Sequence, residues 1–153
     1  MLDSSDGLKP CFGMVAWTVW KYEREGGRCP LDEWIASNAV TKKDKASLDS
    51  RIDKILGING QLPPEFLKQY HGTRLHELKV RAMKKQLRPL CVVLPERRII
   101  ILCGAIEKDG KISPGDLERA ENLRSALENG SGNLVIYYQT ARPMEPVSRP
   151  GIP

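Results

Sequence analysis

The feature that most constrains the fold is a run of consecutive apolar residues at 99–103, within a strand-like segment that covers residues 98–106. A strand exposed on one face alternates apolar and polar side chains, whereas a strand buried on both faces is apolar throughout. The run is much shorter than the ~20 apolar residues that cross a bilayer. It therefore predicts a central strand covered on both faces, which requires a layered domain.

Three other segments have the apolar spacing of amphipathic helices. One begins at Pro30 and carries Trp34 on its apolar face, and the next covers residues 41–56. The third follows Ser113, a residue suited to an N-cap, and ends at Asn129. We expect the first two helices to form a helical hairpin.

Four further segments, beside the central one, have strand composition: residues 15–22, 75–81, 87–94 and 133–139. Along residues 75–81 the polar Glu77, Lys79 and Arg81 alternate with apolar side chains, so they share one face. The order is strand, two helices, three strands, helix, strand. It predicts an α+β fold, with a small, mainly antiparallel sheet flanked by helices and an extra C-terminal strand.

The chain of 153 residues has the length of one ordinary domain. We assign residues 14–140 to that domain, residues 1–13 to an N-terminal arm, and residues 141–153 to a proline-rich tail, since its four prolines forbid regular structure. The first residues lack the basic flank and apolar stretch of a signal peptide, and no segment is suited to a membrane. We expect a cytoplasmic protein.

Positive charge is concentrated in one stretch. Residues 68–98 hold nine Lys and Arg against two Glu, whereas the rest of the chain holds 15 basic and 17 acidic residues. Such a concentration favours a polyanion, such as nucleic acid, as the binding partner.

Several chemistries are disfavoured by the residues that are missing. The chain has no phosphate-binding loop, dinucleotide-binding glycine motif or serine-hydrolase elbow. Its two histidines, His71 and His76, and its widely spaced cysteines predict neither a metal site nor a disulfide framework. We expect no metal, no cofactor and reduced thiols, and a structural role for His76.

The candidate site consists of cations at the ends of neighbouring strands: Lys79, Arg81, Lys84, Lys85, Arg88, Lys108 and Lys111. If they converge on one groove of the sheet, they can hold phosphates by charge and by guanidinium hydrogen bonds. An equally good interpretation from charge alone is a set of solvated surface residues.

The motifs resemble a known family. Residues 75–81 read Leu-His-Glu-Leu-Lys-Val-Arg, Arg88 lies in the next strand, and residues 99–111 lead through Gly-Ala-Ile-Glu-Lys to Asp-Gly-Lys. Asp-Leu-Glu-Arg-Ala then begins the last helix at residue 116, and residues 29–35 resemble the family's first helix. Over about residues 14–129 the chain is similar to the RelE/ParE superfamily, and within it to HigB-type toxins of phage and plasmid origin.

This resemblance implies a RelE-like fold and a toxin of a toxin–antitoxin pair that cuts mRNA on the ribosome. Its partners would be the ribosome, mRNA and a cognate antitoxin, which we expect to be a helix-turn-helix protein. The matching positions imply catalytic roles for Lys79, Arg81, Arg88 and Lys108. We expect Lys84, Lys85, Lys111 and His71 to bind RNA.

The chain departs from the family at several positions. Lys79 stands where relatives often have Arg, Ala105 replaces an aromatic residue, and Glu107 replaces a Lys. The family's C-terminal catalytic Tyr or His has no secure counterpart. For Tyr137 and Tyr138 we favour a core or sheet role.

The expected reaction is attack of an RNA 2′-hydroxyl on the adjacent phosphate without a metal. Arg81 and Arg88 would stabilise the phosphorane, since a guanidinium stays protonated and contacts two oxygens. Lys79 would serve as base if neighbouring cations lower its pKa. Glu77 is an alternative base, although we favour an ion pair with Lys79.

Two other functions stay open. The chain could be a non-catalytic binding protein that kept the basic face, which the loss of positive charge at Glu107 and the missing C-terminal catalytic residue favour. It could also be a gyrase inhibitor of the ParE branch, which shares the fold.

Overall fold

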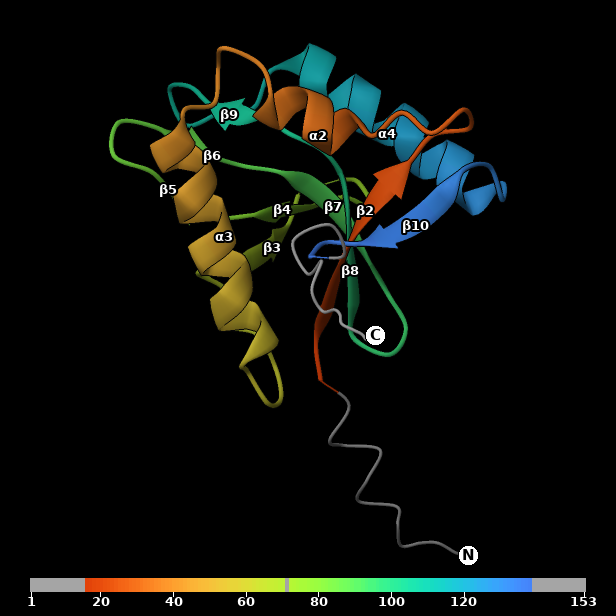
Figure 1. Ribbon diagram of the computed structural model, residues 1–153, viewed down its shortest axis with the longest axis horizontal. Helices are drawn as coiled ribbons and strands as arrows, with labels where there is room; N and C mark the ends of the chain where they lie inside the picture. Colours follow the sequence, from red (N-terminus) through yellow and green to blue (C-terminus); the bar gives the residue numbers. More distant parts are fainter. Residues whose placement is uncertain (1–15, 71, 139–153) are drawn as a thin grey trace, which may run out of the picture.

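The computed structural model describes residues 16–70 and 72–138, so the expected N-terminal arm, the proline-rich tail and His71 lie outside the described residues. The strands are β2 (Thr18–Glu23), β3 (Leu67–Gln69), β4 (His76–Leu78), β5 (Val80–Arg81), β6 (Gln86–Leu87), β7 (Leu90–Leu94), β8 (Arg98–Cys103), β9 (Ile106–Glu107) and β10 (Asn133–Ile136). The helices are α2 (Pro30–Ile35), α3 (Lys42–Leu56) and α4 (Pro114–Glu128). The fold is α+β (Figure 1).

Six strands form the main sheet in the order β10-β2-β8-β7-β4-β3. β2 runs parallel to β8, while every other neighbouring pair of this sheet is antiparallel. β8 therefore lies between the first strand of the described chain and β7, its neighbour in sequence. The sheet is mixed, with antiparallel pairing dominant.

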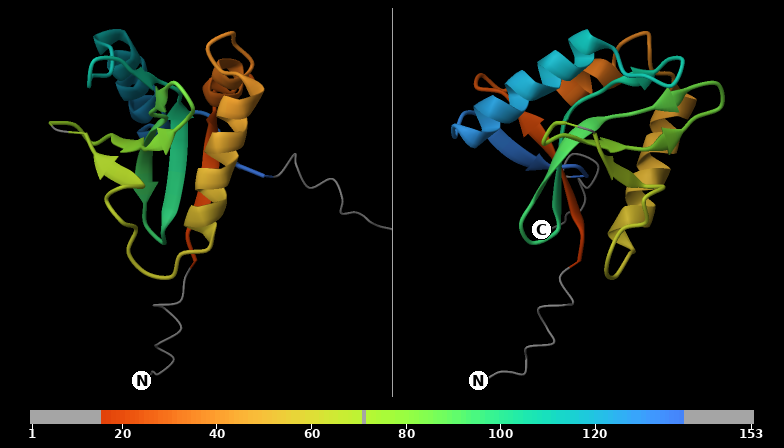
Figure 2. Two further views of the ribbon diagram at one scale, coloured as in Figure 1. Left: turned by 90° about the vertical axis from the view of Figure 1, so that its left-hand side faces the viewer. Right: turned by 180° about the vertical axis from the view of Figure 1, so that it is seen from behind.

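Helices cover both faces of this sheet. α2 and α3 lie on one face and α4 lies on the other, as the edge-on view in Figure 2 shows. Ile99 and Ile101 of β8 pack with the α2 and α3 side, whereas Ile100 and Leu102 pack with the α4 side. All four side chains are fully buried, which confirms the prediction of a central strand covered on both faces.

Three of the expected strands divide into shorter pieces. The segment 75–81 divides at Lys79 into β4 and β5, the segment 87–94 divides after Leu87, and the segment 98–106 ends its first strand at Cys103. The pieces β5, β6 and β9 leave the main sheet and form a second sheet of three strands. Backbone bonds from Lys79 N to Phe66 O and from Arg88 N to Ala105 O stabilise the breaks.

The helix ends match their sequence signals. Thr41 caps α3 through a reciprocal capping box with Asp44, and the Ser113 hydroxyl accepts a hydrogen bond from Asp116 N at the start of α4. Among residues 16–70 and 72–138, none of the helices combines the length and the apolar character that crossing a membrane requires.

Candidate nucleic-acid interface

Four of the expected site residues, Arg81, Lys84, Lys85 and Lys108, line one open hollow of about 710 Å³. Gln86 and Glu107 also line it, and we call this hollow the basic groove. It lies along the second sheet and the hairpin that joins β5 to β6. Two segments far apart in the sequence thus bring cations to one surface.

Paired strands place Arg81 beside this groove. Arg81 lies opposite Gln86 on β6, and Gln86 lies opposite Glu107 on β9. Directly opposite residues of antiparallel strands project to the same face, so the three side chains form one row across the small sheet. Arg81 is exposed at the end of this row.

Lys85 anchors the β5–β6 hairpin to the start of α3. Its ammonium lies 2.7 Å from Asp44 Oδ2 and donates to the carbonyl of Ala39 at 2.7 Å. This hydrogen-bonded ion pair, together with the Thr41 amide, holds the pKa of Asp44 below its ordinary range. Lys85 therefore fixes one wall of the groove, and its charge is already balanced.

Lys108 and Lys111 are held opposite each other by a tight turn. Their backbone groups exchange two hydrogen bonds of 2.8 and 2.9 Å, and the turn residues Asp109 and Gly110 have φ of 53° and 75°. An Asp-Gly pair with two positive φ angles is typical of a type I′ hairpin turn. Both lysines are exposed.

Arg88 does not join the exposed cations, contrary to the expectation for a phosphate-binding residue. It is 8% exposed, and its Nε lies 3.1 Å from Glu77 Oε1 and 3.0 Å from Glu107 Oε1. These are ion pairs by distance, since Nε donates to neither oxygen in hydrogen-bond geometry. The guanidinium also donates to Leu87 O and to Gln86 Oε1.

The surroundings of Arg88 correct a second expectation. We expected Glu77 to hold Lys79, whereas its ion pair is with Arg88. Lys79 lies half-buried between β4 and β5 and does not line the basic groove. The structure thus brings Arg81, Lys84 and Lys108 together and leaves Arg88 and Lys79 outside that group.

Three cations of the basic groove are available to bind an anion. Within residues 16–70 and 72–138, Arg81, Lys84 and Lys108 have no ion-pair partner. Glu107 is the one carboxylate among the described lining residues, and Arg88 already offsets its charge. Unpaired cations facing a concave surface attract phosphates.

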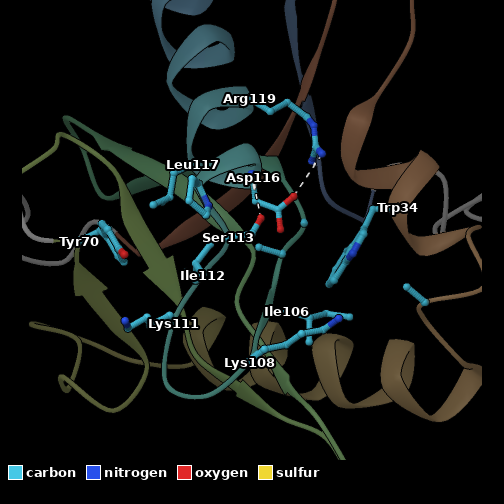
Figure 3. A pocket seen from close by; sticks show the side chains of 14 residues that line it. Trp34, Tyr70, Ile106, Lys108, Lys111, Ile112, Ser113, Asp116, Leu117 and Arg119 are labelled. Carbon is cyan, nitrogen blue, oxygen red and sulfur yellow. Dashed lines mark hydrogen bonds and ion pairs between the residues drawn. The ribbon is translucent and has the colours of Figure 1, made fainter.

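A second hollow, of about 580 Å³, adjoins the groove, and Lys108 lines both. Trp34 stands on one side of it and Tyr70 on the other, with Lys111 at the edge (Figure 3). We call it the aromatic pocket. The sequence places Trp34 on the apolar face of a helix and indicates no role for Tyr70, since nothing in their spacing brings the two together.

Other polar and titratable groups have structural roles. The hydroxyl of Tyr137 donates to Asp49 Oδ1 and that of Tyr138 donates to Asp53 Oδ1, which ties the chain after β10 to α3. Burial raises the pKa of the Cys103 thiol to about 11. No cluster of three or more His, Cys, Asp and Glu suited to a metal ion lies in the part of the chain that the structure describes.

No family model and no curated protein matches the chain in sequence comparisons. The expectation of a RelE/ParE-like protein therefore depends on the motifs described above.

Proposed function

We propose that the protein is a RelE-type toxin, a ribosome-dependent mRNA endoribonuclease whose basic groove receives the RNA backbone. The observation that carries this proposal is the convergence of Arg81, Lys84 and Lys108, each without an ion-pair partner among the described residues, on one open hollow. Exposed cations orient phosphate poorly without a second surface, so we assign the final positioning of mRNA to the ribosome.

The proposed reaction is an intramolecular transfer. The 2′-oxygen attacks the adjacent phosphorus, the bond from phosphorus to the 5′-oxygen breaks, and the products are a 2′,3′-cyclic phosphate and a 5′-hydroxyl. Arg81 stabilises the phosphorane, because a guanidinium keeps its charge and contacts two oxygens. The Lys108 ammonium is the proton donor for the leaving 5′-oxygen.

Glu107 is the group we assign to accept the 2′-hydroxyl proton, since it is the carboxylate that lines the groove. Its side chain is 25% exposed, whereas that of Glu77 is 13% exposed and lies on the other side of Arg88. Arg88 is then a positioning residue, because it holds Glu107 by an ion pair and contacts no RNA. This assignment replaces Lys79 and Glu77 as base.

An antitoxin fits the same surface. A segment rich in Asp and Glu would pair with Arg81, Lys84 and Lys108 and would exclude RNA from the groove. The proposed setting is the cytoplasm, where mRNA and ribosomes are present.

The test is induction of the chain in bacteria followed by mapping of mRNA ends. We expect growth arrest and new ends at fixed positions within codons, carrying 5′-hydroxyl and 2′,3′-cyclic phosphate groups. Arg81→Ala and Lys108→Ala should abolish both effects. Arg28→Ala is the matched control, since Arg28 is 73% exposed and pairs with Glu33 away from the groove. Unchanged mRNA ends would refute the nuclease, and DNA damage without mRNA cleavage would indicate a gyrase inhibitor.

The burial of Arg88 favours a second candidate, a non-catalytic RNA-binding protein. An arginine enclosed by two carboxylates is unavailable to phosphate, so the groove has one guanidinium fewer than the family motif implies. RNA binding that depends on Arg81, with intact mRNA in induced cells, would support this candidate.

A further inference from the structure

The aromatic pocket contains two polar aromatic atoms that have no partner. The chain has three Trp and four Tyr, and the structure describes all seven. Five of them hydrogen-bond through their indole nitrogen or hydroxyl: Trp17, Trp20, Tyr22, Tyr137 and Tyr138. Within residues 16–70 and 72–138, the Trp34 indole and the Tyr70 hydroxyl have no such bond, and these are the two that line the pocket. Their free polar atoms are available to a ligand.

Gly104 fixes the position of the Trp34 ring. A Cβ at residue 104 would lie 1.8 Å from Trp34 Cδ2 and 2.1 Å from Cε3, so the indole lies directly against the backbone at the end of β8. Any side chain at this position would displace the ring. The sequence thus keeps a rigid aromatic wall beside the pocket.

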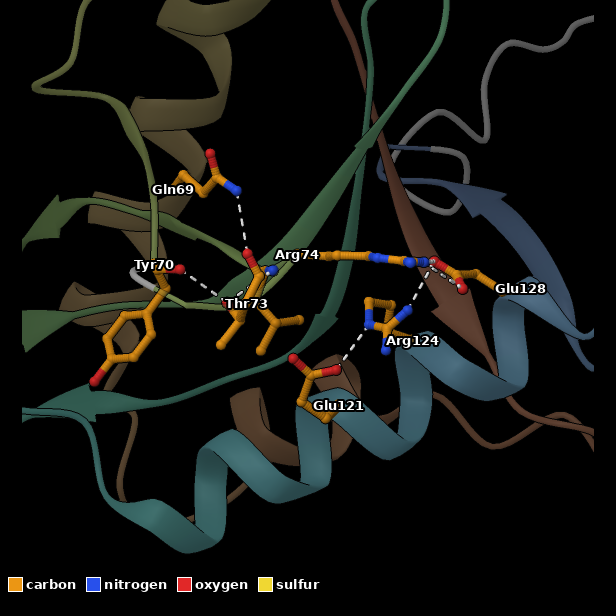
Figure 4. Close-up of polar contacts among 8 residues, drawn as sticks. Gln69, Tyr70, Thr73, Arg74, Glu121, Arg124 and Glu128 are labelled. Carbon is orange, nitrogen blue, oxygen red and sulfur yellow. Dashed lines mark hydrogen bonds and ion pairs between the residues drawn. The ribbon is translucent and has the colours of Figure 1, made fainter.

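Tyr70 is positioned from the opposite side by the connection between β3 and β4. Its amide donates to Leu75 O at 2.8 Å, and its carbonyl accepts from the Thr73 hydroxyl at 2.9 Å. Figure 4 shows this turn and the neighbouring ion pairs of Arg74 and Arg124 with Glu128 on α4. The turn carrying Tyr70 is therefore connected to the helix that borders the pocket.

The edge of the pocket is cationic. Lys108 and Lys111 have no ion-pair partner within the described ranges and project from the same hairpin turn. Asp116, the carboxylate of the lining, lies 3.2 Å from the Arg119 guanidinium, which offsets its charge. An aromatic wall with unpaired cations at the edge matches a nucleotide, which joins an aromatic base to a phosphate.

We infer that the aromatic pocket receives one nucleotide of single-stranded RNA, turned out of the strand whose backbone lies in the basic groove. The base stacks on Trp34, and Lys108 and Lys111 contact its phosphates. The volume of about 580 Å³ lies within the roughly 300–1,000 Å³ of small-molecule sites. Lys108 lines both hollows, so the strand can pass from one to the other. This inference depends on the proposed function, because it requires RNA in the groove.

The test uses eight-nucleotide RNAs that carry 2-aminopurine at one position each, with the full chain and in the absence of ribosomes. We expect strong quenching of fluorescence at one position on binding, because stacking on an indole quenches this base. An abasic nucleotide at that position should weaken binding about tenfold, the effect of losing one base–aromatic stack.

Variants of the protein separate the loss of base stacking from other effects of a substitution on RNA binding. Trp34→Leu should weaken binding about tenfold, abolish the quenching, and make the abasic RNA bind as well as the intact RNA. Trp20→Leu is the matched control, since the Trp20 indole donates to Thr18 and lies outside the pocket, and it should keep the quenching. Lys111→Gln is a surface change that tests the edge without altering the core, and it should weaken binding a few-fold.

The outcomes distinguish the two proposals. RNA binding that Arg81→Gln weakens, with no quenched position and no effect of the abasic nucleotide, would overturn the pocket and leave the proposed function intact. Absence of RNA binding would overturn the pocket, whereas the proposed function is decided separately by the mapping of mRNA ends in induced cells, where ribosomes are present. Displacement of the RNA base by an equal concentration of free adenosine monophosphate would assign the pocket to a free nucleotide and overturn the RNA assignment.

Discussion

At the residue scale, Arg88 is a cation that stabilises the fold and does not contribute charge to the surface. Its guanidinium compensates two carboxylates that are mostly buried, at 3.1 and 3.0 Å. Removing one partner from a buried ion pair leaves uncompensated charge and costs about 3–5 kcal/mol. We expect Arg88→Met to lower the free energy of unfolding by about that amount in urea titrations at pH 7.

A triple variant tests whether uncompensated carboxylate charge is the cause of this loss of stability. Arg88→Met combined with Glu77→Gln and Glu107→Gln removes the uncompensated charges and should recover most of the lost stability. Arg81→Ala is the control, since Arg81 is exposed and has no ion-pair partner in the described chain, and it should change stability by less than about 0.5 kcal/mol. An Arg88→Met protein as stable as the wild type would contradict the structural role.

Glu96 has a left-handed backbone conformation, which is unfavourable for a residue other than glycine. It has φ of 67° in the turn between β7 and β8, a left-handed conformation that costs a residue with a Cβ about 1 kcal/mol. Glycine adopts this conformation freely. We expect Glu96→Gly to raise the thermal midpoint by several degrees in circular dichroism melts, whereas Glu65→Gly, at an exposed loop residue without positive φ, should not.

At the element scale, the start of α3 couples helix capping to the basic groove. The Asp44 carboxylate accepts hydrogen bonds from the Thr41 amide and the Lys85 ammonium, and Asp44 is 4% exposed. Its pKa is lowered from the ordinary value of 3.8, first by Lys85 and then by Thr41. A lowered pKa stabilises the fold above pH ~4, and this contribution is lost as the pH falls through the folded value.

We therefore expect Asp44→Asn to destabilise the protein at pH 7 and to differ less from the wild type as the pH falls from 5 to 2. Urea titrations across this range measure the difference. Thr41→Ala should cost about 1 kcal/mol by loss of the cap. A gap between Asp44→Asn and the wild type that stays constant down to pH 2 would contradict the role of the carboxylate charge.

Elements with a marked beginning and end could be predicted from the sequence. Pro30, Thr41 and Ser113 mark the helix starts, and each helix begins where these residues indicate. Strand breaks could not be predicted, because the apolar pattern continues through Lys79 and Leu87 while the hydrogen-bonding partner changes. β3 was missed since it has three residues and little burial.

At the scale of the whole molecule, the cations of the basic groove predict that the affinity for RNA falls as the salt concentration rises. If Arg81, Lys84, Lys108 and Lys111 each neutralise one phosphate, log K should fall with log salt at a slope of roughly −3. Anisotropy of a labelled single-stranded RNA between 50 and 300 mM KCl measures it. Arg81→Gln should reduce the slope by about 0.7, and the matched change Arg28→Gln should leave it unchanged. A slope near zero would exclude phosphate contacts.

The candidate site was partly predictable from charge. The local excess of lysine and arginine in residues 68–98 indicated the surface to which Arg81 and Lys84 belong, and the position of Lys108 at the end of a neighbouring strand indicated that it joins them. The sequence could not indicate which cation would meet an acid, because Glu77 and Glu107 reach Arg88 from different strands. The pairing of Trp34 with Tyr70 likewise depends on three-dimensional packing.

The parallel contact of β2 with β8 has a consequence for synthesis. β2 is the first strand of the described chain, yet its neighbours on either side, β8 and β10, are made more than seventy residues later. Contacts between such distant segments form slowly and only after the later segment exists. A nascent chain therefore carries β2 without a strand partner until translation has passed residue 103, and β2 gains its second neighbour only after residue 136.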